Sequence, residues 1–189
     1  MDKVMDILKR SEALLEGHFL LSSGKHSNRY VQCARALKDT RDGEALGKII
    51  GEKVADLDID LVVGPAMGGV IIAYEVGRAL GKESIFTERK DNIMTLRRGF
   101  EIKEGQRILI VEDVVTTGKS TLEVKKLLEE LGGVVVGVGC IVDRRSTDID
   151  LNMPVYSAIK LEIESYDKDN CPLCNDGVEL YQPGSRKIG

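Results

Sequence analysis

The sequence contains no tryptophan, and aromatic residues make up only 4% of its 189 residues. Acidic residues outnumber basic ones by 31 to 27, which gives a formal net charge of -4, so nucleic acid is not expected as a partner. No apolar run reaches the length of a transmembrane helix, and residues 1–6 lack the hydrophobic segment of a secretory signal. We therefore expect a cytoplasmic protein with no membrane partner.

Histidine and cysteine are also scarce. The chain has two histidines and four cysteines, namely His18, His26, Cys33, Cys140, Cys171 and Cys174. Cys171 and Cys174 form a C-x-x-C motif, but a structural disulfide is not expected in a reducing cytosol. A zinc site would need two more ligands, and the sequence has neither a second C-x-x-C nor a paired histidine motif. We interpret the pair as free thiols in a terminal loop, with zinc binding or a redox role as the alternative.

The composition is that of one compact domain. Hydrophobic residues make up 42% of the chain, enough for a substantial core, and no low-complexity linker divides it. We expect a single domain made of a hood segment (residues 1–35), an α/β core (36–165) and a C-terminal tail with the C-x-x-C motif (166–189).

Apolar periodicity predicts the elements of that core. Helical spacing is found over residues 3–15, 42–57, 70–80 and 120–131, and β-rich runs are found at 59–63, 84–87, 107–111, 134–142 and 155–159. This alternation predicts a parallel sheet flanked by helices. Residues 94–96 and 99–102 are expected to pair as a short hairpin that carries a charged loop.

The most informative segment runs from Arg107 to Thr121, where a buried strand leads into a glycine turn and then a helix. The strand ends on two adjacent carboxylates, Glu112 and Asp113. The turn that follows, Thr116-Thr117-Gly118-Lys119-Ser120, offers hydroxyls and the free amides of a helix N-terminus, which suit a phosphate monoester. The carboxylates would repel phosphate but accept hydrogen bonds from neutral hydroxyls. The segment therefore predicts a ligand with vicinal hydroxyls beside a phosphate, such as ribose 5-phosphate.

Two other interpretations of this segment compete. Gly118-Lys119-Ser120 matches the end of the nucleotide P-loop motif G-x-x-x-x-G-K-[ST], but Asp113 stands where the first glycine belongs. That carboxylate would place negative charge where a polyphosphate lies. The plainer alternative is an ordinary strand-to-helix turn with a solvated acidic pair. The fixed order of strand, carboxylates, threonines, glycine and helix favours a binding site over both.

The segment resembles the phosphoribosyl diphosphate signature of the type I phosphoribosyltransferases, and other segments narrow the resemblance to the orotate phosphoribosyltransferases. The resemblance implies the type I phosphoribosyltransferase fold with a small N-terminal hood. It implies transfer of the 5-phosphoribosyl group to orotate, giving orotidine 5-phosphate and pyrophosphate in pyrimidine biosynthesis. It also implies Mg2+ carried by the donor and a homodimer. The donor would contact Glu112, Asp113, Val114, Val115, Thr116, Thr117, Gly118, Lys119, Ser120, Arg89 and Lys90.

Two further segments resemble parts of the donor site. Gly64 to Gly69 resembles the loop that touches pyrophosphate, although Met67-Gly68 stands where many relatives have a tyrosine-lysine pair. The cation-rich segment from Glu88 to Gly99 resembles the start of the catalytic loop, with Arg89 and Lys90 as candidate catalytic cations. A mobile cationic loop would stabilise charge on the leaving pyrophosphate and exclude water. In the family this loop reaches the neighbour's site.

The acceptor side is represented by three residues. Tyr30 ends a stretch that resembles the S-G-x-x-S-x-x-Y hood motif, Arg144 aligns with the arginine used against orotate, and Thr116 aligns with a threonine that also touches it. A guanidinium can bind the carboxylate of orotate bidentately. Arg145 is interpreted as a neighbour. The alternatives are a purine or other base as acceptor, for which Arg144 would have no carboxylate, or a non-enzymatic regulator that senses phosphoribosyl diphosphate.

Overall fold

The protein is described by a computed structural model that covers residues 3–21, 23–146 and 149–183. Within these residues the main sheet has six strands in the order β5-β4-β3-β6-β7-β8. Their bounds are β3 Leu61–Pro65, β4 Glu83–Lys90, β5 Ile93–Leu96, β6 Arg107–Val115, β7 Val134–Asp143 and β8 Val155–Lys160. Only the β4–β5 pair among them is antiparallel. The predicted α/β class with a largely parallel sheet is confirmed.

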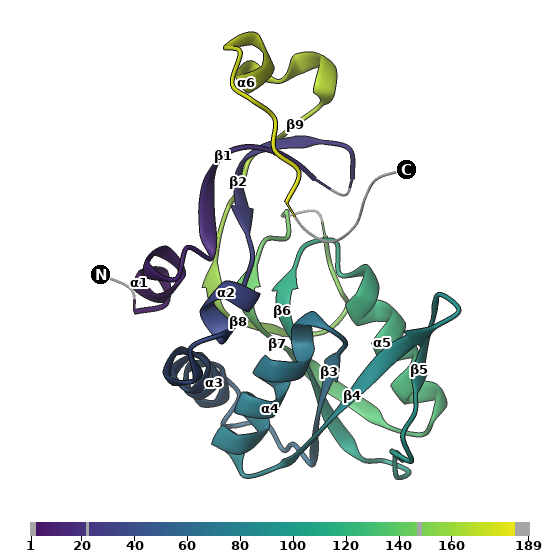
Figure 1. The fold of residues 1–189 in the computed structure, drawn as a ribbon. Helices are drawn as coiled ribbons and strands as arrows, with labels where there is room; N and C mark the ends of the chain where they lie inside the picture. Colours follow the sequence, from purple (N-terminus) through teal and green to yellow (C-terminus); the bar gives the residue numbers. More distant parts are fainter. Residues whose placement is uncertain (1–2, 22, 147–148, 184–189) are drawn as a thin grey trace.

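Helices cover both faces of this sheet (Figure 1). The helices α3 (Thr40–Lys53) and α4 (Gly68–Leu80) pack on one face, and α5 (Lys119–Glu130) packs on the other. Along β6, Leu109 and Val111 belong to the first apolar cluster, and Ile108 and Ile110 belong to the second. Because successive side chains of a strand point to opposite faces, a strand covered on both sides must be apolar throughout.

A small sheet forms the hood. It consists of β1 (Leu14–Leu20), β2 (His26–Val31) and β9 (Ser165–Tyr166), all antiparallel. Figure 1 shows the hood beyond the carboxyl end of β6, with the short helix α6 (Pro172–Asn175) on its far side. The remaining short elements are α2 (Ala34–Leu37) and the 3-10 helix η1 (Lys168–Asn170).

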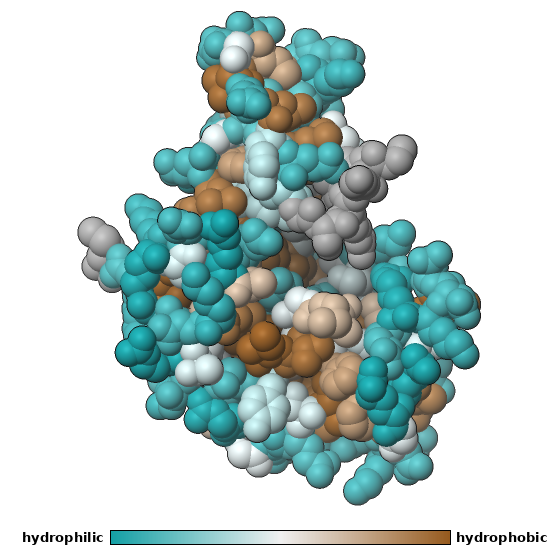
Figure 2. All heavy atoms as spheres, in the orientation of Figure 1, coloured by the Kyte–Doolittle hydropathy of each residue, from teal (hydrophilic) through white to brown (hydrophobic). Residues whose placement is uncertain are grey.

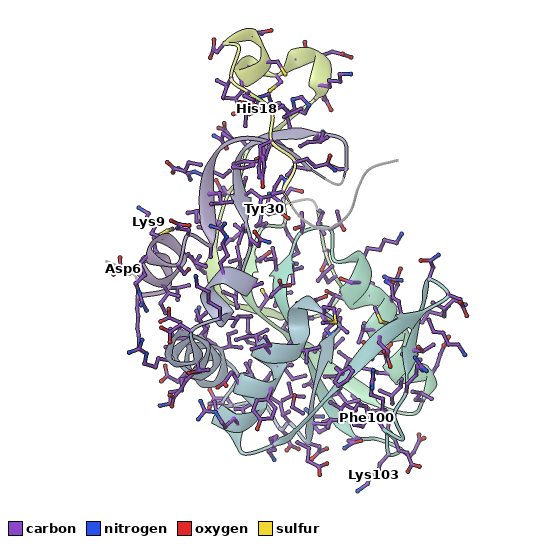
Figure 3. The ribbon with its side chains drawn as sticks, viewed as in Figure 1. Asp6, Lys9, His18, Tyr30, Phe100 and Lys103 are labelled. Carbon is purple, nitrogen blue, oxygen red and sulfur yellow. The ribbon has the colours of Figure 1, made fainter. Side chains whose placement is uncertain are left out.

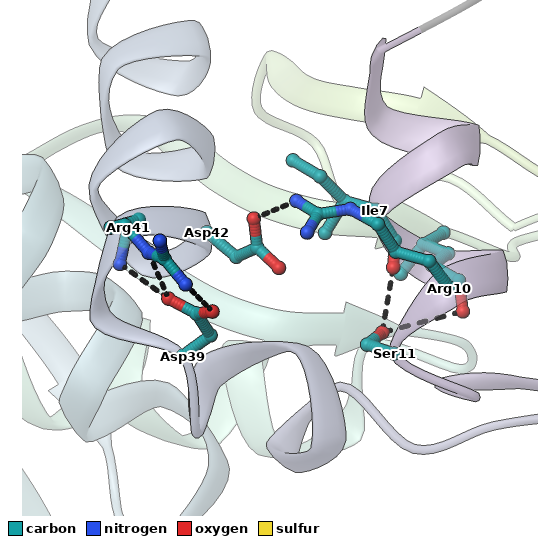
Figure 4. Close-up of polar contacts among 7 residues, drawn as sticks. Ile7, Arg10, Ser11, Asp39, Arg41 and Asp42 are labelled. Atoms are coloured by element: carbon teal, nitrogen blue, oxygen red, sulfur yellow. Dashed lines mark hydrogen bonds and ion pairs between the residues drawn. The ribbon is translucent and has the colours of Figure 1, made fainter.

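Polar contacts hold the N-terminal helix α1 (Lys3–Arg10) against α3 (Figure 4). The guanidinium of Arg10 pairs with Asp42, a buried carboxylate in the first turn of α3. The side chain of Asp39 caps the same helix, because its Oδ1 accepts a hydrogen bond from the backbone N–H of Arg41 at 3.0 Å. The Arg10–Asp42 pair therefore joins the start of the hood to the core, and the cap fixes the start of α3 beside it.

Several predicted bounds shift, such as the end of α3 at Lys53 rather than residue 57 and the end of β6 at Val115 rather than 111, and two predictions differ more clearly. The first helix ends at Arg10 rather than at residue 15, because Glu12 has a φ of 53° and β1 begins at Leu14. The predicted hairpin between 94–96 and 99–102 is wrong, since β5 pairs with the preceding strand β4. The turn that joins them, Asp91-Asn92, has φ values of 52° and 64°, the conformation of a tight two-residue hairpin. None of the helices in the described residues is long and apolar enough to cross a membrane.

Candidate functional site

The acidic pair lies at the carboxyl end of β6, at the centre of the sheet. Glu112 is 5% exposed, and its Oε1 accepts a hydrogen bond from the hydroxyl of Ser120 at 2.8 Å. Asp113 is half-buried, and its Oδ1 accepts a hydrogen bond from the backbone N–H of Val114 at 2.9 Å. The strand and the first turn of α5 therefore hold the two carboxylates together.

Burial controls the protonation of both carboxylates. It raises the pKa of Glu112 to about 8, while the hydrogen bond from Ser120 acts in the opposite direction and the charge of Asp113 adds to the rise. Burial also raises the pKa of Asp113, opposed by backbone hydrogen bonds. Two adjacent carboxylates with raised pKa values are typical of a functional site that gains hydrogen-bond donors or a cation when its ligand binds.

The glycine turn opens α5 beside the acidic pair. Gly118 has a φ of 70°, a left-handed conformation that favours glycine, and an added Cβ would overlap the side chain of Leu151. Thr116 and Thr117 are exposed. The N–H groups in the first turn of a helix have no partner within the helix, so this end of α5 can bind an anion. The turn and the carboxylates form the two halves of the predicted phosphate and hydroxyl site.

A second glycine turn packs directly on the acidic pair. A Cβ added to Gly68 would lie 2.6 Å from Oδ1 of Asp113, and one added to Gly69 would lie 2.7 Å from the carbonyl oxygen of Val111. A larger residue at position 69 would clash with the backbone, and one at position 68 would displace the side chain of Asp113. The structure thus brings the segment from Gly64 to Gly69 against the signature segment, as the sequence predicted.

The arginine after β7 faces the hood. The Nε of Arg144 is buried and makes no hydrogen bond with any described residue. Burial lowers the pKa of Arg144, while nearby Tyr30 and Cys33 act in the opposite direction. Tyr30 is half-buried on β2, between the hood and the core in Figure 3, and its ring centroid lies 5.9 Å from that of Phe19. Arg144 and Tyr30 therefore border the same space.

The neighbouring arginine is already paired. The guanidinium of Arg145 donates to both carboxylate oxygens of Asp143 at 3.0 Å, and its backbone N–H also donates to Asp143 at 3.0 Å. Burial would raise the pKa of Asp143, but these hydrogen bonds lower it. Arg144 is consequently the arginine with a free donor at this strand end.

The two candidate loop cations lie on the β4–β5 hairpin, which projects from the sheet edge in Figure 1. Arg89 pairs with Glu123 of α5 and donates to the carbonyl oxygen of Asn92 at 2.9 Å. Lys90 is exposed next to the tight turn. Within the described residues, the hydrogen bonds of Arg89 therefore go to α5 and to its own hairpin, and not to the acidic pair.

The buried thiols near the site are unsuited to nucleophilic catalysis. Burial raises the pKa of Cys33 well above its usual range, with a contribution from Asp113, and burial also raises the pKa of Cys140. A protonated thiol is a poor nucleophile. The chemistry of the site must come from its carboxylates, amides and cations.

Sequence analysis missed one group of residues. His18 and His26 lie beside Cys171 and Cys174, with all four potential ligand atoms within 4.8 Å of one another. The available signal was the eight-residue spacing of the two histidines around the turn at Gly24, because a hairpin brings such residues together.

A separate cavity of about 430 Å³ lies between β5 and the far part of α5, away from the acidic pair. It is lined by Thr95, Leu96, Phe100, Glu101, Ile102, Leu127 and Leu131.

Comparisons with known proteins agree with this geometry. The family model described as the phosphoribosyl transferase domain matches residues 36–171. An orotate phosphoribosyltransferase of Caldanaerobacter subterraneus subsp. tengcongensis is 51% identical over 187 residues, covering 99% of this chain and 98% of the relative. Solved structures are similar too. The orotate phosphoribosyltransferase of Mycobacterium tuberculosis H37Rv in complex with inorganic phosphate has a TM-score of 0.69 at 30% identity, covering 85% of this chain and 95% of that chain.

Another solved structure supports the fold alone. The orotate phosphoribosyltransferase of Aeropyrum pernix has a TM-score of 0.73 at 24% identity and covers 84% of this chain and 93% of that chain. The fold of most of this chain is thus shared with a protein of low sequence identity.

Proposed function

The chain belongs to the phosphoribosyltransferase family, and we propose that it transfers the 5-phosphoribosyl group of phosphoribosyl diphosphate to orotate. The products are orotidine 5-phosphate and pyrophosphate, and the reaction belongs to pyrimidine biosynthesis. The observation in the structure that carries the choice of acceptor is the buried, unpaired Nε of Arg144, close to the signature turn. A buried donor without a partner is costly, and a ligand carboxylate would satisfy it.

The donor site would use the two adjoining turns. Glu112 and Asp113 accept hydrogen bonds from the 2- and 3-hydroxyls of the ribose, and the free amides and hydroxyls of residues 114–120 hold the 5-phosphate. The backbone of Gly68 and Gly69 approaches the pyrophosphate, which lies across the same edge. This arrangement orients the C1 carbon of the ribose toward the space below the hood.

The acceptor would occupy that space. Arg144 binds the carboxylate of orotate, Thr116 contacts the same ring, and Tyr30 covers it from the hood. The N1 atom of orotate forms a bond to C1 as the bond from C1 to the pyrophosphate oxygen breaks. The bonding electron pair leaves with pyrophosphate, and the N1 proton is released. No covalent intermediate with the protein is needed, because positioning and electrostatic stabilisation supply the catalysis.

Mg2+ would enter with the donor. The residues present suit this ion, because Glu112 and Asp113 offer hard carboxylate oxygens. Burial raises the pKa of both carboxylates, and a nearby cation would favour their ionised form. When bound, Mg2+ spreads the negative charge of the leaving pyrophosphate.

Arg89 and Lys90 would act in a homodimer. The β4–β5 hairpin projects from the sheet edge, so it is placed to reach a second copy of the chain. Figure 2 shows apolar side chains in the middle of one face, over α4, where Met67, Ile71 and Tyr74 are 85%, 51% and 63% exposed. Their spacing of four and three residues gives one helix face, and an exposed apolar face favours self-association. Met67 follows a cis peptide bond with Ala66.

We also propose that the chain acts as one domain in the cytoplasm. β9, which follows the core, pairs with β2 of the hood, so the tail (166–189), the core (36–165) and the hood (1–35) depend on one another. Both substrates are charged and would not cross a membrane unaided, which favours the compartment in which they are made.

The proposal is tested with purified protein, phosphoribosyl diphosphate and Mg2+. Each base is supplied separately, and both the nucleotide and the pyrophosphate are quantified. Orotate should be converted to orotidine 5-phosphate. Turnover of hypoxanthine, xanthine or adenine but not orotate would identify a purine enzyme instead. Tight binding of phosphoribosyl diphosphate without pyrophosphate release under any condition would identify a regulator.

A further inference from the structure

A cluster of two histidines and two cysteines lies in the hood, outside the proposed active site. The four side chains are His18 on β1, His26 on β2, Cys171 and Cys174. His18, His26 and Cys171 are buried, being 3%, 3% and 1% exposed, and Cys174 is exposed. Figure 3 shows His18 at the far end of the hood, next to α6. The cluster joins the two ends of the sequence.

Four of the distances between the ligand atoms are close to those in the coordination shell of one metal ion, and all the ligand atoms lie within 4.8 Å of one another. Nε2 of His18 lies 2.9 Å from Nδ1 of His26, 3.5 Å from Sγ of Cys171 and 3.8 Å from Sγ of Cys174. Sγ of Cys174 lies 3.3 Å from Nδ1 of His26. A tetrahedral zinc ion with ordinary bond lengths separates two nitrogen ligands by about 3.3 Å, and nitrogen from sulfur by about 3.6 Å. The observed separations scatter around these values.

The backbone explains how the ligands meet. His26 is opposite Leu20 in the β1–β2 ladder, so it is a diagonal neighbour of His18 on the same face, with ring centroids 4.8 Å apart. Cys171 and Cys174 are three residues apart around the single turn of α6, which places both thiols on one side of the turn. The short turn therefore faces the histidine pair with two sulfurs.

The second nitrogen of His18 is also satisfied. Its Nδ1 lies 2.8 Å from the carbonyl oxygen of Val178. Because a carbonyl only accepts, Nδ1 carries the proton, and Nε2 presents its lone pair to the cluster. Histidines that bind metals almost always donate their other N–H to a carbonyl or carboxylate in this way. Val178 is held in turn by a hydrogen bond from its N–H to the carbonyl oxygen of Leu173 at 3.0 Å.

We propose that His18, His26, Cys171 and Cys174 bind a single structural zinc ion. A tetrahedral set of two nitrogens and two thiolates favours zinc, and with four protein ligands the shell has no open position for catalysis. A two-iron cluster would need its ligands divided between separate irons, whereas these four ligand atoms converge on one point. A Cys171–Cys174 disulfide would use only the two sulfurs and would not explain why both imidazoles also point to them.

The zinc would fasten the C-terminal segment to the hood. The backbone N–H of Tyr181 donates to the carbonyl of His18 at 2.8 Å, and the N–H of Leu20 donates to the carbonyl of Tyr181 at 3.0 Å. These hydrogen bonds and the short β9 hold the tail on β1 and β2. A metal bound by ligands from both segments links them directly, and its binding energy adds to the stability of the hood.

The test is metal analysis of the full-length protein, expressed without a histidine tag and dialysed against metal-free buffer. We expect one zinc ion per chain. Cys174→Ser should lose the zinc, and because this side chain is exposed, the variant should still fold. Cys140→Ala is the matched control, since it also removes a thiol but lies in β7, and it should keep the full zinc content. Wild-type protein without zinc, or with another metal, would overturn the proposal, as would full zinc in Cys174→Ser.

Two further measurements are independent of enzyme activity. Cobalt(II) added to the zinc-free wild-type protein should give the intense visible absorption of a tetrahedral site and a thiolate charge-transfer band. Both should be absent in Cys174→Ser and present in Cys140→Ala. In limited proteolysis, a chelator should make the segment after Tyr166 sensitive to cleavage before the core is cut. Weak octahedral cobalt spectra, or equal proteolysis with and without zinc, would contradict the proposed role.

Discussion

The backbone N–H of Arg144 donates a hydrogen bond to the carbonyl oxygen of Val115 at 2.8 Å. Val115 is the last residue of β6 and immediately precedes Thr116. The arginine proposed to bind the acceptor is therefore fixed to the strand that ends in the turn proposed to bind the donor. Because parallel neighbouring strands end at the same edge, residues proposed to bind the phosphoribosyl donor and the base acceptor lie close together there, although they come from different parts of the sequence.

The acidic pair should be needed for donor binding and not for folding. Glu112→Gln together with Asp113→Asn removes two carboxylates that binding of the donor would favour in the ionised form, as acceptors for the ribose hydroxyls. Hydrogen bonds to charged groups contribute about 1.5–3 kcal/mol each, so affinity for phosphoribosyl diphosphate should fall at least about tenfold. Isothermal titration calorimetry measures this, with Glu101→Gln, an exposed carboxylate, as the control. Unchanged affinity in the double variant would refute the assigned role.

Glu112 should also make the stability of the ligand-free protein depend on pH. Burial raises its pKa to about 8 from the ordinary value of 4.5, so the folded state favours the protonated form. The resulting stabilisation is complete below pH 4.5 and is lost as the pH rises through 8. Between these pH values the free energy of unfolding should fall by up to about 1.4 kcal/mol per pH unit.

Urea unfolding at several pH values isolates this contribution. The free energy of unfolding of wild type minus that of Glu112→Gln should decrease as the pH rises from about 6 to about 8. Glu101→Gln should give a constant difference. A constant difference for Glu112→Gln as well would show that its pKa is not raised in the folded protein.

Gly118 should be required for two separable reasons, its backbone conformation and its contact with Leu151. Gly118→Ala should lower the free energy of unfolding by about 1 kcal/mol, because alanine disfavours the left-handed conformation. The overlap of its Cβ with Leu151 should lower it further. Gly81→Ala is the matched control, because Gly81 has a φ of 65° but open space around a Cβ. Thermal unfolding should show a larger loss for Gly118→Ala, together with weaker binding of phosphoribosyl diphosphate. Equal losses of stability would show that the contact with Leu151 is unimportant.

Subunit mixing should reveal whether the loop cations act across a dimer. Lys90→Ala and Arg144→Ala should each lower activity strongly. If Lys90 acts on the neighbour's site, a heterodimer of the two variants contains one site with both residues intact. Activity should then recover after the variants are mixed under conditions of subunit exchange. Absence of recovery, with heterodimers verified by native mass spectrometry, would place Lys90 in its own subunit's site or outside catalysis.

Local sequence patterns are sufficient to predict the core and the strand-turn-helix segment that is proposed to bind the donor. The run from Ile108 to Val111 had to be a strand covered on both faces, and the carboxylates, threonines and glycine that follow lie within one short segment. Their relative positions depend on the end of one strand and the start of one helix. The contact between Gly68 and Asp113 was expected only in outline, because it depends on how two parallel strands end together.

The features that the sequence does not predict are one local turn and two contacts between distant residues. The sequence predicts the wrong partner for β5, because the Asp91-Asn92 hairpin turn lies within a run of charged residues that hides its signal. The ion pair between Arg10 and Asp42 joins two helices far apart in the sequence. His18 and Cys171 are separated by 153 residues, so no spacing rule could join them before the hood was known to pair with the tail.

The most direct test of the central claim compares orotate with uracil, which has the same ring without the carboxylate. If Arg144 binds that carboxylate beside the donor turn, wild-type kcat/KM for orotate should exceed that for uracil by about 10²-fold or more. In Arg144→Ala this ratio should collapse, mainly through the KM for orotate, while affinity for phosphoribosyl diphosphate changes little. A ratio near one in the wild type, or a ratio that survives Arg144→Ala, would contradict the account.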